Sequence, residues 1–174
     1  AIVNKLNEIL EDTVGPKELT LFTELAKTIE PGKIQLISGS CLDALQLMNE
    51  SQFDLIITSP PYANRYDYTR TYALELAMLD VSSDDLNKMR QTMLSCTVEN
   101  KEKDFIDINK NWELVMQILK KQTLLQEIIG YLEFKKKEKT INNNGIPRML
   151  KGYFYEMACV IYELYRVLNK NGAV

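Results

Sequence analysis

Two consecutive prolines at the end of a short apolar run constrain this chain more than any other feature. The run covers residues 53–58, FDLIIT, and its β-branched content predicts a strand that is buried on both faces. Pro60 and Pro61 lack backbone donors and hold Ser59 extended, so the strand must end there and a stiff turn must follow. Because ligands of open α/β sheets bind at the carboxyl ends of strands, we expect a functional turn at residues 59–62.

The turn Ser59-Pro60-Pro61-Tyr62 carries groups suited to one kind of chemistry. The exocyclic amine of cytosine or adenine is a poor nucleophile, because its lone pair is delocalised into the ring. The Ser59 hydroxyl and the Pro60 carbonyl can accept the two amine hydrogens, so that the nitrogen recovers its lone pair as it attacks a methyl donor. Tyr62 can stack on a base that has been extruded from the duplex.

At these residues the chain resembles the DNA amino-methyltransferases, whose motif is Ser, Asn or Asp followed by Pro-Pro-Tyr or a close aromatic variant. The longer string TSPPYANRYDYTRTYALEL, residues 58–76, is similar to a group of prokaryotic site-specific DNA methylases. The resemblance implies a restriction-modification enzyme that uses S-adenosylmethionine and acts on double-stranded DNA with a flipped base. It also implies which residues are catalytic: Ser59, Pro60, Pro61 and Tyr62.

Serine at position 59 resembles the cytosine-N4 subgroup, and adenine-N6 methylation is the alternative. Methylation of RNA or of a protein glutamine is a more distant alternative, because Asn would then be expected at this position. A non-catalytic nucleic-acid-binding or assembly module is the alternative from a different class of function.

The fold class implied by the resemblance is α/β, a partial Rossmann-like methyltransferase fold with a helical insertion. Residues 33–37, KIQLI, predict a strand and residues 42–48 a helix, so residues 33–58 form a predicted β-α-β unit with parallel strands. In the family, the turn after such a strand contacts the adenine ring of the cofactor, usually through an Asp directly after a Gly. Here Ser40 occupies that place, and the predicted cofactor-binding residues are Ser40, Cys41 and Asp43. Asp43 can equally well cap the helix that follows.

A Gly-rich turn for the methionine part of the cofactor is missing, because none of the seven glycines lies in a G-x-G run. We therefore expect the chain to be part of a larger enzyme whose Gly-rich half lies upstream or downstream. Alone, the chain should be inactive, bind S-adenosylmethionine poorly and self-associate through its incomplete sheet.

Residues 82–150 lack a strand pattern and predict a helical insertion, a candidate target-recognition element. Residues 1–81 and 151–174 are then parts of the catalytic domain. The insertion carries 12 basic and 10 acidic residues, against 9 and 14 in the rest of a chain whose net charge is −3. A solvated lysine run is the alternative interpretation of its basic part. The predicted DNA-binding residues are Arg65, Tyr66, Lys135, Lys136, Lys137, Lys139 and Arg148, and the loop 142–145 accompanies them.

Helices are also predicted over residues 2–10, 17–29 and 153–168. In the last of these, the side chains expected to face the core are Phe154, Met157, Ala158, Ile161, Tyr165 and Leu168. Residues 169–172 should end the helix, and residues 173–174 should begin a strand.

Composition excludes several function classes. The chain has no histidine, which rules out Ser/His and Cys/His triads and argues against a metal site. Its three cysteines are widely spaced, so we expect free and mostly buried thiols rather than disulfides. No apolar run approaches the roughly 20 residues of a membrane helix, and no signal peptide is present, so the cytoplasm is the expected location.

Overall fold

The computed structural model describes residues 2–14, 32–64 and 66–174, with the backbone alone for residues 11–14. Two units make up the chain, residues 1–36 and residues 37–174. In the first unit, α1 (Ile2–Val14) confirms the helix predicted over residues 2–10. The helix predicted over residues 17–29 lies outside the described residues.

The strand predicted over residues 33–37 is wrong. The described residues 32–38 form no strand, and Ile34 and Leu36 are 89% and 92% exposed. A strand requires a hydrogen-bonded neighbour, and the strand at residue 53 pairs elsewhere. The predicted β-α-β unit over residues 33–58 is therefore wrong as well.

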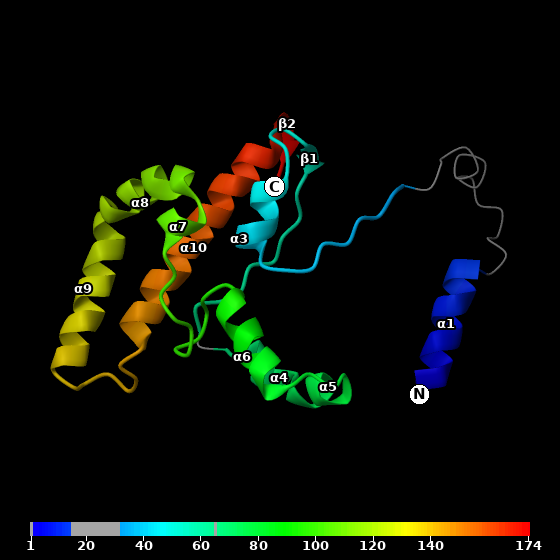
Figure 1. Ribbon diagram of the computed structural model, residues 1–174, viewed down its shortest axis with the longest axis horizontal. Coiled ribbons are helices and arrows are strands. Elements are labelled where there is room, and N and C mark those ends of the chain that lie inside the picture. Colours follow the sequence, from blue (N-terminus) through cyan, green and yellow to red (C-terminus); the bar gives the residue numbers. More distant parts are fainter. Residues whose placement is uncertain (1, 15–31, 65) are drawn as a thin grey trace. The chain divides into compact units, whose positions relative to one another are not determined.

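The sheet of the second unit joins two strands that are far apart in sequence. β1 (Phe53–Leu55) runs parallel to β2 (Leu168–Ala173), and the two lie side by side in Figure 1. Their register pairs Phe53 with Leu168 and Leu55 with Ala173, so β2 contains extra residues. This pairing was not predicted, because the parallel partner expected for β1 was the segment 33–37. The expected helix-ending turn at residues 169–172 is part of β2 instead.

Burial of β1 also differs from the prediction. Leu55 is 61% exposed and Ile57, beyond the strand end, is 88% exposed. The prediction of a strand buried on both faces is therefore wrong for this chain. The reason is that β2 is the one strand paired with β1 among the described residues.

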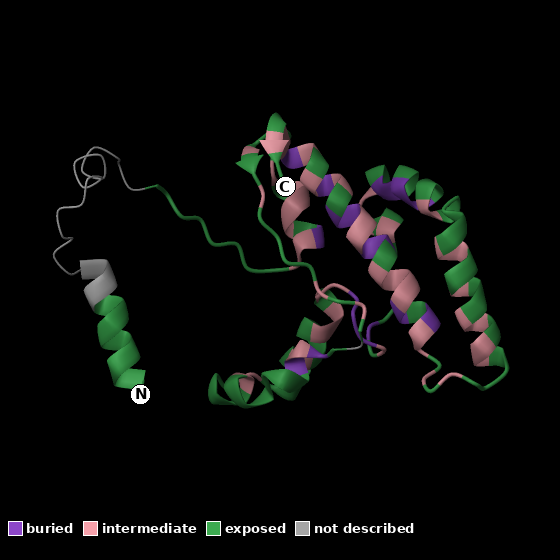
Figure 2. Ribbon diagram, turned by 180° about the vertical axis from the view of Figure 1, so that it is seen from behind, coloured by how far each residue is buried: buried purple, intermediate pink, exposed green. Residues whose placement is uncertain are grey.

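The long helix α10 (Ile146–Val167) organises the second unit. It begins earlier than predicted, with Pro147 in its first turn, where a missing N–H costs no hydrogen bond. Figure 2 shows buried residues recurring along it. α8 (Glu113–Lys120), α9 (Thr123–Lys137) and α3 (Cys41–Ala44) all contact α10. The core cluster comprises Leu42, Trp112, Val115, Met116, Tyr155, Cys159 and Val160.

The face that α10 turns to this core matches the prediction only in part, because Ala158 packs against the cluster and three other predicted side chains do not. Phe154, Ile161 and Tyr165 are 40%, 61% and 81% exposed. Two glutamates, Glu156 and Glu163, are buried on the inward face instead, each 1% exposed. Pairing with polar partners from other segments allows these two acids to face inward.

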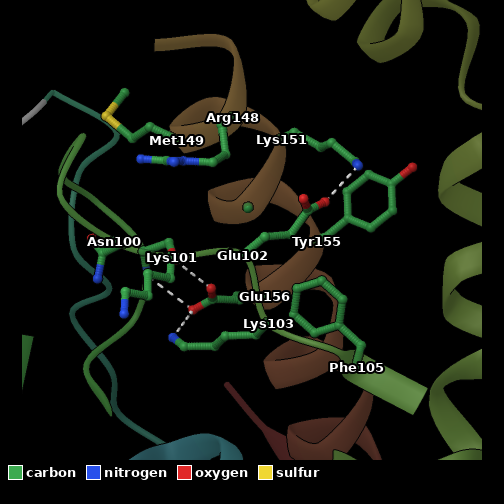
Figure 3. A pocket seen from close by; sticks show the side chains of 12 residues that line it. Asn100, Lys101, Glu102, Lys103, Phe105, Arg148, Met149, Lys151, Tyr155 and Glu156 are labelled. Carbon is green, nitrogen blue, oxygen red and sulfur yellow. Dashed lines mark hydrogen bonds and ion pairs between the residues drawn. The ribbon is translucent and has the colours of Figure 1, made fainter. Parts of the chain in front are cut away.

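Each buried glutamate attaches a loop to α10. In Figure 3, Lys103 reaches the Glu156 carboxylate, with Nζ at 2.9 Å, and the N–H and hydroxyl of Ser95 also donate to it. Glu163 accepts from Trp112 Nε1 at 2.8 Å and from Arg166 Nε at 2.7 Å. The segments around residues 95–103 and 109–112 are thereby held against the helix.

The remaining elements are short helices. They are the 3₁₀ turns Leu45–Leu47 and Lys110–Trp112, α4 (Tyr68–Thr71), α5 (Ala73–Met78), α6 (Ser83–Thr92) and α7 (Phe105–Ile108). Ser82 caps α6 by accepting from the Asp85 N–H. Residues 82–150 contain helices and no strand, which agrees with the helical insertion. The domain boundaries themselves stay a prediction.

Candidate active site

The Ser-Pro-Pro-Tyr turn follows the carboxyl end of β1. The last bond between the strands runs from the Ile56 N–H to the Ala173 carbonyl, at 2.9 Å, and residues 57–62 then leave the sheet. Ser59 and Pro60 are exposed, Pro61 is half-buried, and Tyr62 is 69% exposed. β1 ends at Leu55, so the strand is shorter than the predicted 53–58, and residues 56–62 follow it as an irregular segment. The groups proposed to hold an amine are open to a large ligand.

The residues just after the turn are held by local contacts. The Tyr66 N–H donates to Asn64 Oδ1 at 3.0 Å, and the Tyr66 ring packs edge-on against Tyr68 with ring centroids 5.0 Å apart. The Cys96 thiol contacts the Tyr66 carbonyl at 3.5 Å. Tyr66 remains 44% exposed, so its ring is oriented and still accessible. Arg65, the other predicted DNA-binding residue here, lies outside the described residues.

Asp67 is a buried anchor that sequence reasoning missed. Its carboxylate caps α4 by accepting from the Thr69 N–H at 3.0 Å and the Thr69 hydroxyl at 2.6 Å. It also pairs with Arg90 Nε at 3.1 Å and Arg70 Nε at 3.3 Å. Burial alone would raise the pKa of Asp67, but the Thr69 hydrogen bonds and the two arginines hold it below its ordinary value of 3.8. The Asp-x-Thr spacing of a helix cap is the sequence signal that could have identified it.

A second set of contacts fixes α6 and the loop after it against this anchor. Arg90 Nη2 donates to the Thr69 hydroxyl at 2.7 Å. Asn100 Nδ2 donates to the Arg90 carbonyl at 2.6 Å, while Asn100 Oδ1 accepts from the N–H groups of Cys96 and Thr97. The start of the predicted insertion therefore supports the segment that follows residues 59–62.

The turn predicted to contact the cofactor adenine begins α3. Gly39 adopts φ +145°, a conformation that other residues rarely take, and Ser40 then caps the helix by accepting from the Leu42 N–H at 3.3 Å. Asp43 lies in the first turn and is exposed. Ser40 thus supplies the cap, which leaves the Asp43 carboxylate facing solvent. Burial raises the pKa of the half-buried Cys41 thiol.

The predicted basic residues lie at two places, the end of α9 and the start of α10. Lys135 sits over the rings of Tyr131 and Phe134, at 5.7 and 5.8 Å, and Lys136 is 3.5 Å from Glu133. Lys137 and Lys139 are exposed. Arg148, labelled in Figure 3, donates to the Val98 carbonyl at 2.7 Å. Lys137 and Lys139 are accordingly the members of the set best placed to meet a phosphate.

Two other kinds of site are absent from the described part of the chain. No group of His, Cys, Asp and Glu residues there is arranged to hold a metal ion. No helix within the described ranges has the length and apolar character needed to span a membrane.

Among known proteins, the chain is homologous to type II methyltransferases. It is 53% identical over 173 residues, 99% of its length, to the type II methyltransferase M.AvaI of Nostoc sp. (strain PCC 7120), and equally so to M.AvaI of Anabaena variabilis. It is 41% identical over 148 residues to the type II methyltransferase M.BsoBI of Geobacillus stearothermophilus, 80% of this chain. The chain spans about a third of the length of these relatives, 34% and 29%. No protein-family profile and no solved structure matches it.

Proposed function

We propose that the gene product containing this chain is a site-specific DNA methyltransferase of a restriction-modification system, and that this chain carries its catalytic turn. The observation that carries the proposal is the exposed Ser59-to-Tyr62 turn at the carboxyl end of a parallel strand, in a chain homologous to type II methyltransferases. Its substrates are double-stranded DNA and S-adenosylmethionine.

The roles of the turn residues follow from their chemistry. The Ser59 hydroxyl and the Pro60 carbonyl accept hydrogen bonds from the two N–H groups of the exocyclic amine. These bonds concentrate the lone pair on the nitrogen. Pro61 keeps the turn stiff, so that the acceptors are already in place when charge develops. Tyr62, 69% exposed, stacks on the flipped base. No covalent bond to the protein forms.

The residues around α3 suit the adenine end of the cofactor. S-adenosylmethionine, when bound, supplies an electrophilic methyl group. The exposed Asp43 carboxylate can accept a hydrogen bond from the adenine amine, and Gly39 lets the backbone approach without a side chain in the way. Ser40 positions this turn through its cap, and Cys41 lies beside it. We assign the adenine contact to Asp43 first, because Ser40 already serves the helix.

We assign the acceptor base as cytosine, methylated at N4, because serine occupies the first position of the motif. Nucleosides from DNA treated with the complete gene product and labelled S-adenosylmethionine can be separated and weighed by mass spectrometry. N4-methylcytosine is the expected product. N6-methyladenine would replace the base assignment while keeping the mechanism, and unlabelled DNA would overturn the proposed function.

A further inference from the structure

A polar recess of about 380 Å³ lies beside the segment that follows the catalytic turn. Three stretches line it: the start of α4, the loop after α6 and the loop between α9 and α10. Its lining includes Tyr66, Asp67, Arg70, Val98, Glu99 and Asn143. The fold thus brings Asn143, from the loop predicted to meet DNA, next to Tyr66, which follows the catalytic motif.

The walls of the recess are held in place. Asp67 and Arg90 anchor one side, as described above. On the other side, Asn143 Oδ1 accepts from the Gly145 N–H at 2.8 Å, which orients the side-chain amide and leaves its NH₂ as a donor. A Cβ on Gly145 would lie 3.1 Å from both Asn143 Oδ1 and Val98 Cβ, so the two loops pack closely there.

The charges of the recess disfavour a phosphate. Arg70 Nη2 is 2.8 Å from Glu99 Oε1, and Arg70 Nε is 3.3 Å from Asp67 Oδ2. Two carboxylates therefore surround the one guanidinium that an anion would need. Planar guanidinium, amide and carboxylate groups are instead the side chains that pair with base edges.

Arg70 can exchange its partner at small cost. Its side chain is 69% exposed and that of Glu99 is 37% exposed, so solvent screens their ion pair strongly. A bidentate contact between an arginine and a base edge discriminates more strongly than such a surface pair stabilises. Glu99 holds Arg70 at the rim until a base edge arrives.

We propose that this recess binds the edge of a base that neighbours the target base, with Arg70 and Asn143 as the donors that read it. The inference rests on the proposed function and adds to it specificity-determining residues outside the catalytic motif. Tyr66 is the lining residue nearest to residues 59–62 in the sequence, so the base read there is expected in the DNA segment next to the flipped nucleotide.

The test uses the complete gene product and a library of duplexes with a randomised central segment. Bound duplexes are selected and sequenced, and methylated duplexes are sequenced in parallel. Asn143→Ala should reduce the preference at one or two positions beside the target by about 5- to 100-fold, and leave the other positions unchanged. Asn49→Ala is the control, because Asn49 is exposed between the 3₁₀ turn Leu45–Leu47 and β1 and lies outside the recess lining, and it should keep the wild-type preference.

Glu99→Gln provides the second variant. It removes the charge that pairs with Arg70 Nη2 and leaves the Arg70 Nε contact with Asp67, so we expect tighter binding together with an altered preference at the same position. Thermal unfolding of each variant shows whether it folds as the wild type does. Uniform weakening across all sequences, with a shallower salt dependence, would identify a phosphate contact and overturn the proposal. An unchanged preference in both variants would also overturn it.

The two proposals fail in different ways. If the wild type binds DNA with sequence preference but transfers no methyl group, the proposed function is wrong. The binding preferences of the Asn143→Ala and Glu99→Gln variants then still test whether the recess reads a base. Methyl transfer with no change in preference in either variant would remove the recess proposal alone. Binding without any sequence preference in the wild type would overturn the recess proposal as well.

Discussion

At the scale of single residues, Asp67 anchors the segment that follows residues 59–62. Its side chain is 7% exposed and lies between Arg90 and Arg70, with Thr69 donating to it. The ionised form is favoured in the folded chain, so its pKa lies below 3.8. The stabilisation is therefore complete above that ordinary value and is lost as the pH falls through the folded-state pKa.

Asp67→Asn should lower the free energy of unfolding at neutral pH by about 1.5–3 kcal/mol, since it removes hydrogen bonds to a charged group and leaves Arg90 unpaired. Below pH 3.8 the difference from wild type should shrink, because the wild-type carboxyl is then protonating as well. Denaturant unfolding at several pH values measures both effects. Asp84→Asn, exposed on α6, is the control and should cost about 0.5 kcal/mol. A difference that stays constant down to the lowest pH would contradict the role given to Asp67.

The thiols follow the expectation of free cysteines. Cys96 and Cys159 are buried, Cys41 is half-buried, and burial raises the pKa of Cys159 to about 12. This outcome was predictable because a cysteine without histidine neighbours or a paired cysteine behaves as a small apolar residue.

At the scale of elements, the contact of β2 with β1 depends on Gly172. A Cβ at this position would lie 2.9 Å from the Asp54 carbonyl and 2.7 Å from Leu168 Cδ1. Such distances force the strands apart at the place where the register of the pair is irregular.

Gly172→Ala should therefore destabilise the chain by about 1–3 kcal/mol. Gly130→Ala is the matched control, because Gly130 lies inside α9 with nothing within 4 Å of a new Cβ. It should stabilise the chain by about 0.5–1 kcal/mol through helix propensity. Thermal unfolding of the two variants compares them directly, and equal effects would refute the close contact between the strands.

Some elements could be predicted from the sequence and others could not, for physical reasons. The end of the strand before Ser59 depends on local chemistry, because prolines cannot continue a strand ladder, and the chain does leave the sheet before that residue. The inward face of α10 was predicted only in part, because this helix carries apolar residues over a wide arc and two of its acids are buried through distant partners. The partner of β1 was missed because strand pairing is set by contacts between residues far apart in sequence.

Some residues of the candidate site could likewise be predicted from local sequence, and others come together only in the folded chain. The catalytic turn was visible because prolines act locally. The recess beside Tyr66 was not, because Asn143 and Glu99 meet there only after the chain has folded. Asp67 falls between these cases, since its cap is local but its arginine partner comes from α6.

At the scale of the whole molecule, several exposed apolar side chains form surfaces of the kind that other protein segments bury. Leu55 and Ile57 at β1, and Ile161 and Tyr165 on the outer face of α10, are each more than 60% exposed. Exposed strand edges and apolar patches favour association. We expect the remainder of a protein of the relatives' length to cover them.

The chain by itself should not bind S-adenosylmethionine at micromolar concentration in a calorimetric titration. The backbone donors of a Gly-rich loop are absent, and the loss of two charge-assisted hydrogen bonds, each worth about 1.5–3 kcal/mol, weakens binding by at least about a hundredfold. In light scattering the chain should self-associate. Micromolar affinity for the cofactor would show that the loop is dispensable. A monodisperse monomer in light scattering would show that the exposed apolar surfaces do not act as interfaces between copies of the chain.

The central claim is that Ser59 orients the amine that receives the methyl group. Its most direct test compares wild-type and Ser59→Ala forms of the complete gene product for transfer of labelled methyl groups to DNA, with DNA affinity measured on the same preparations. Ser82→Ala, which removes a helix cap remote from the motif in sequence, controls for the general effect of losing a serine hydroxyl. Ser59→Ala should reduce the transfer rate by about 100-fold or more while DNA affinity stays nearly unchanged. A Ser59→Ala enzyme with the wild-type rate would contradict the claim.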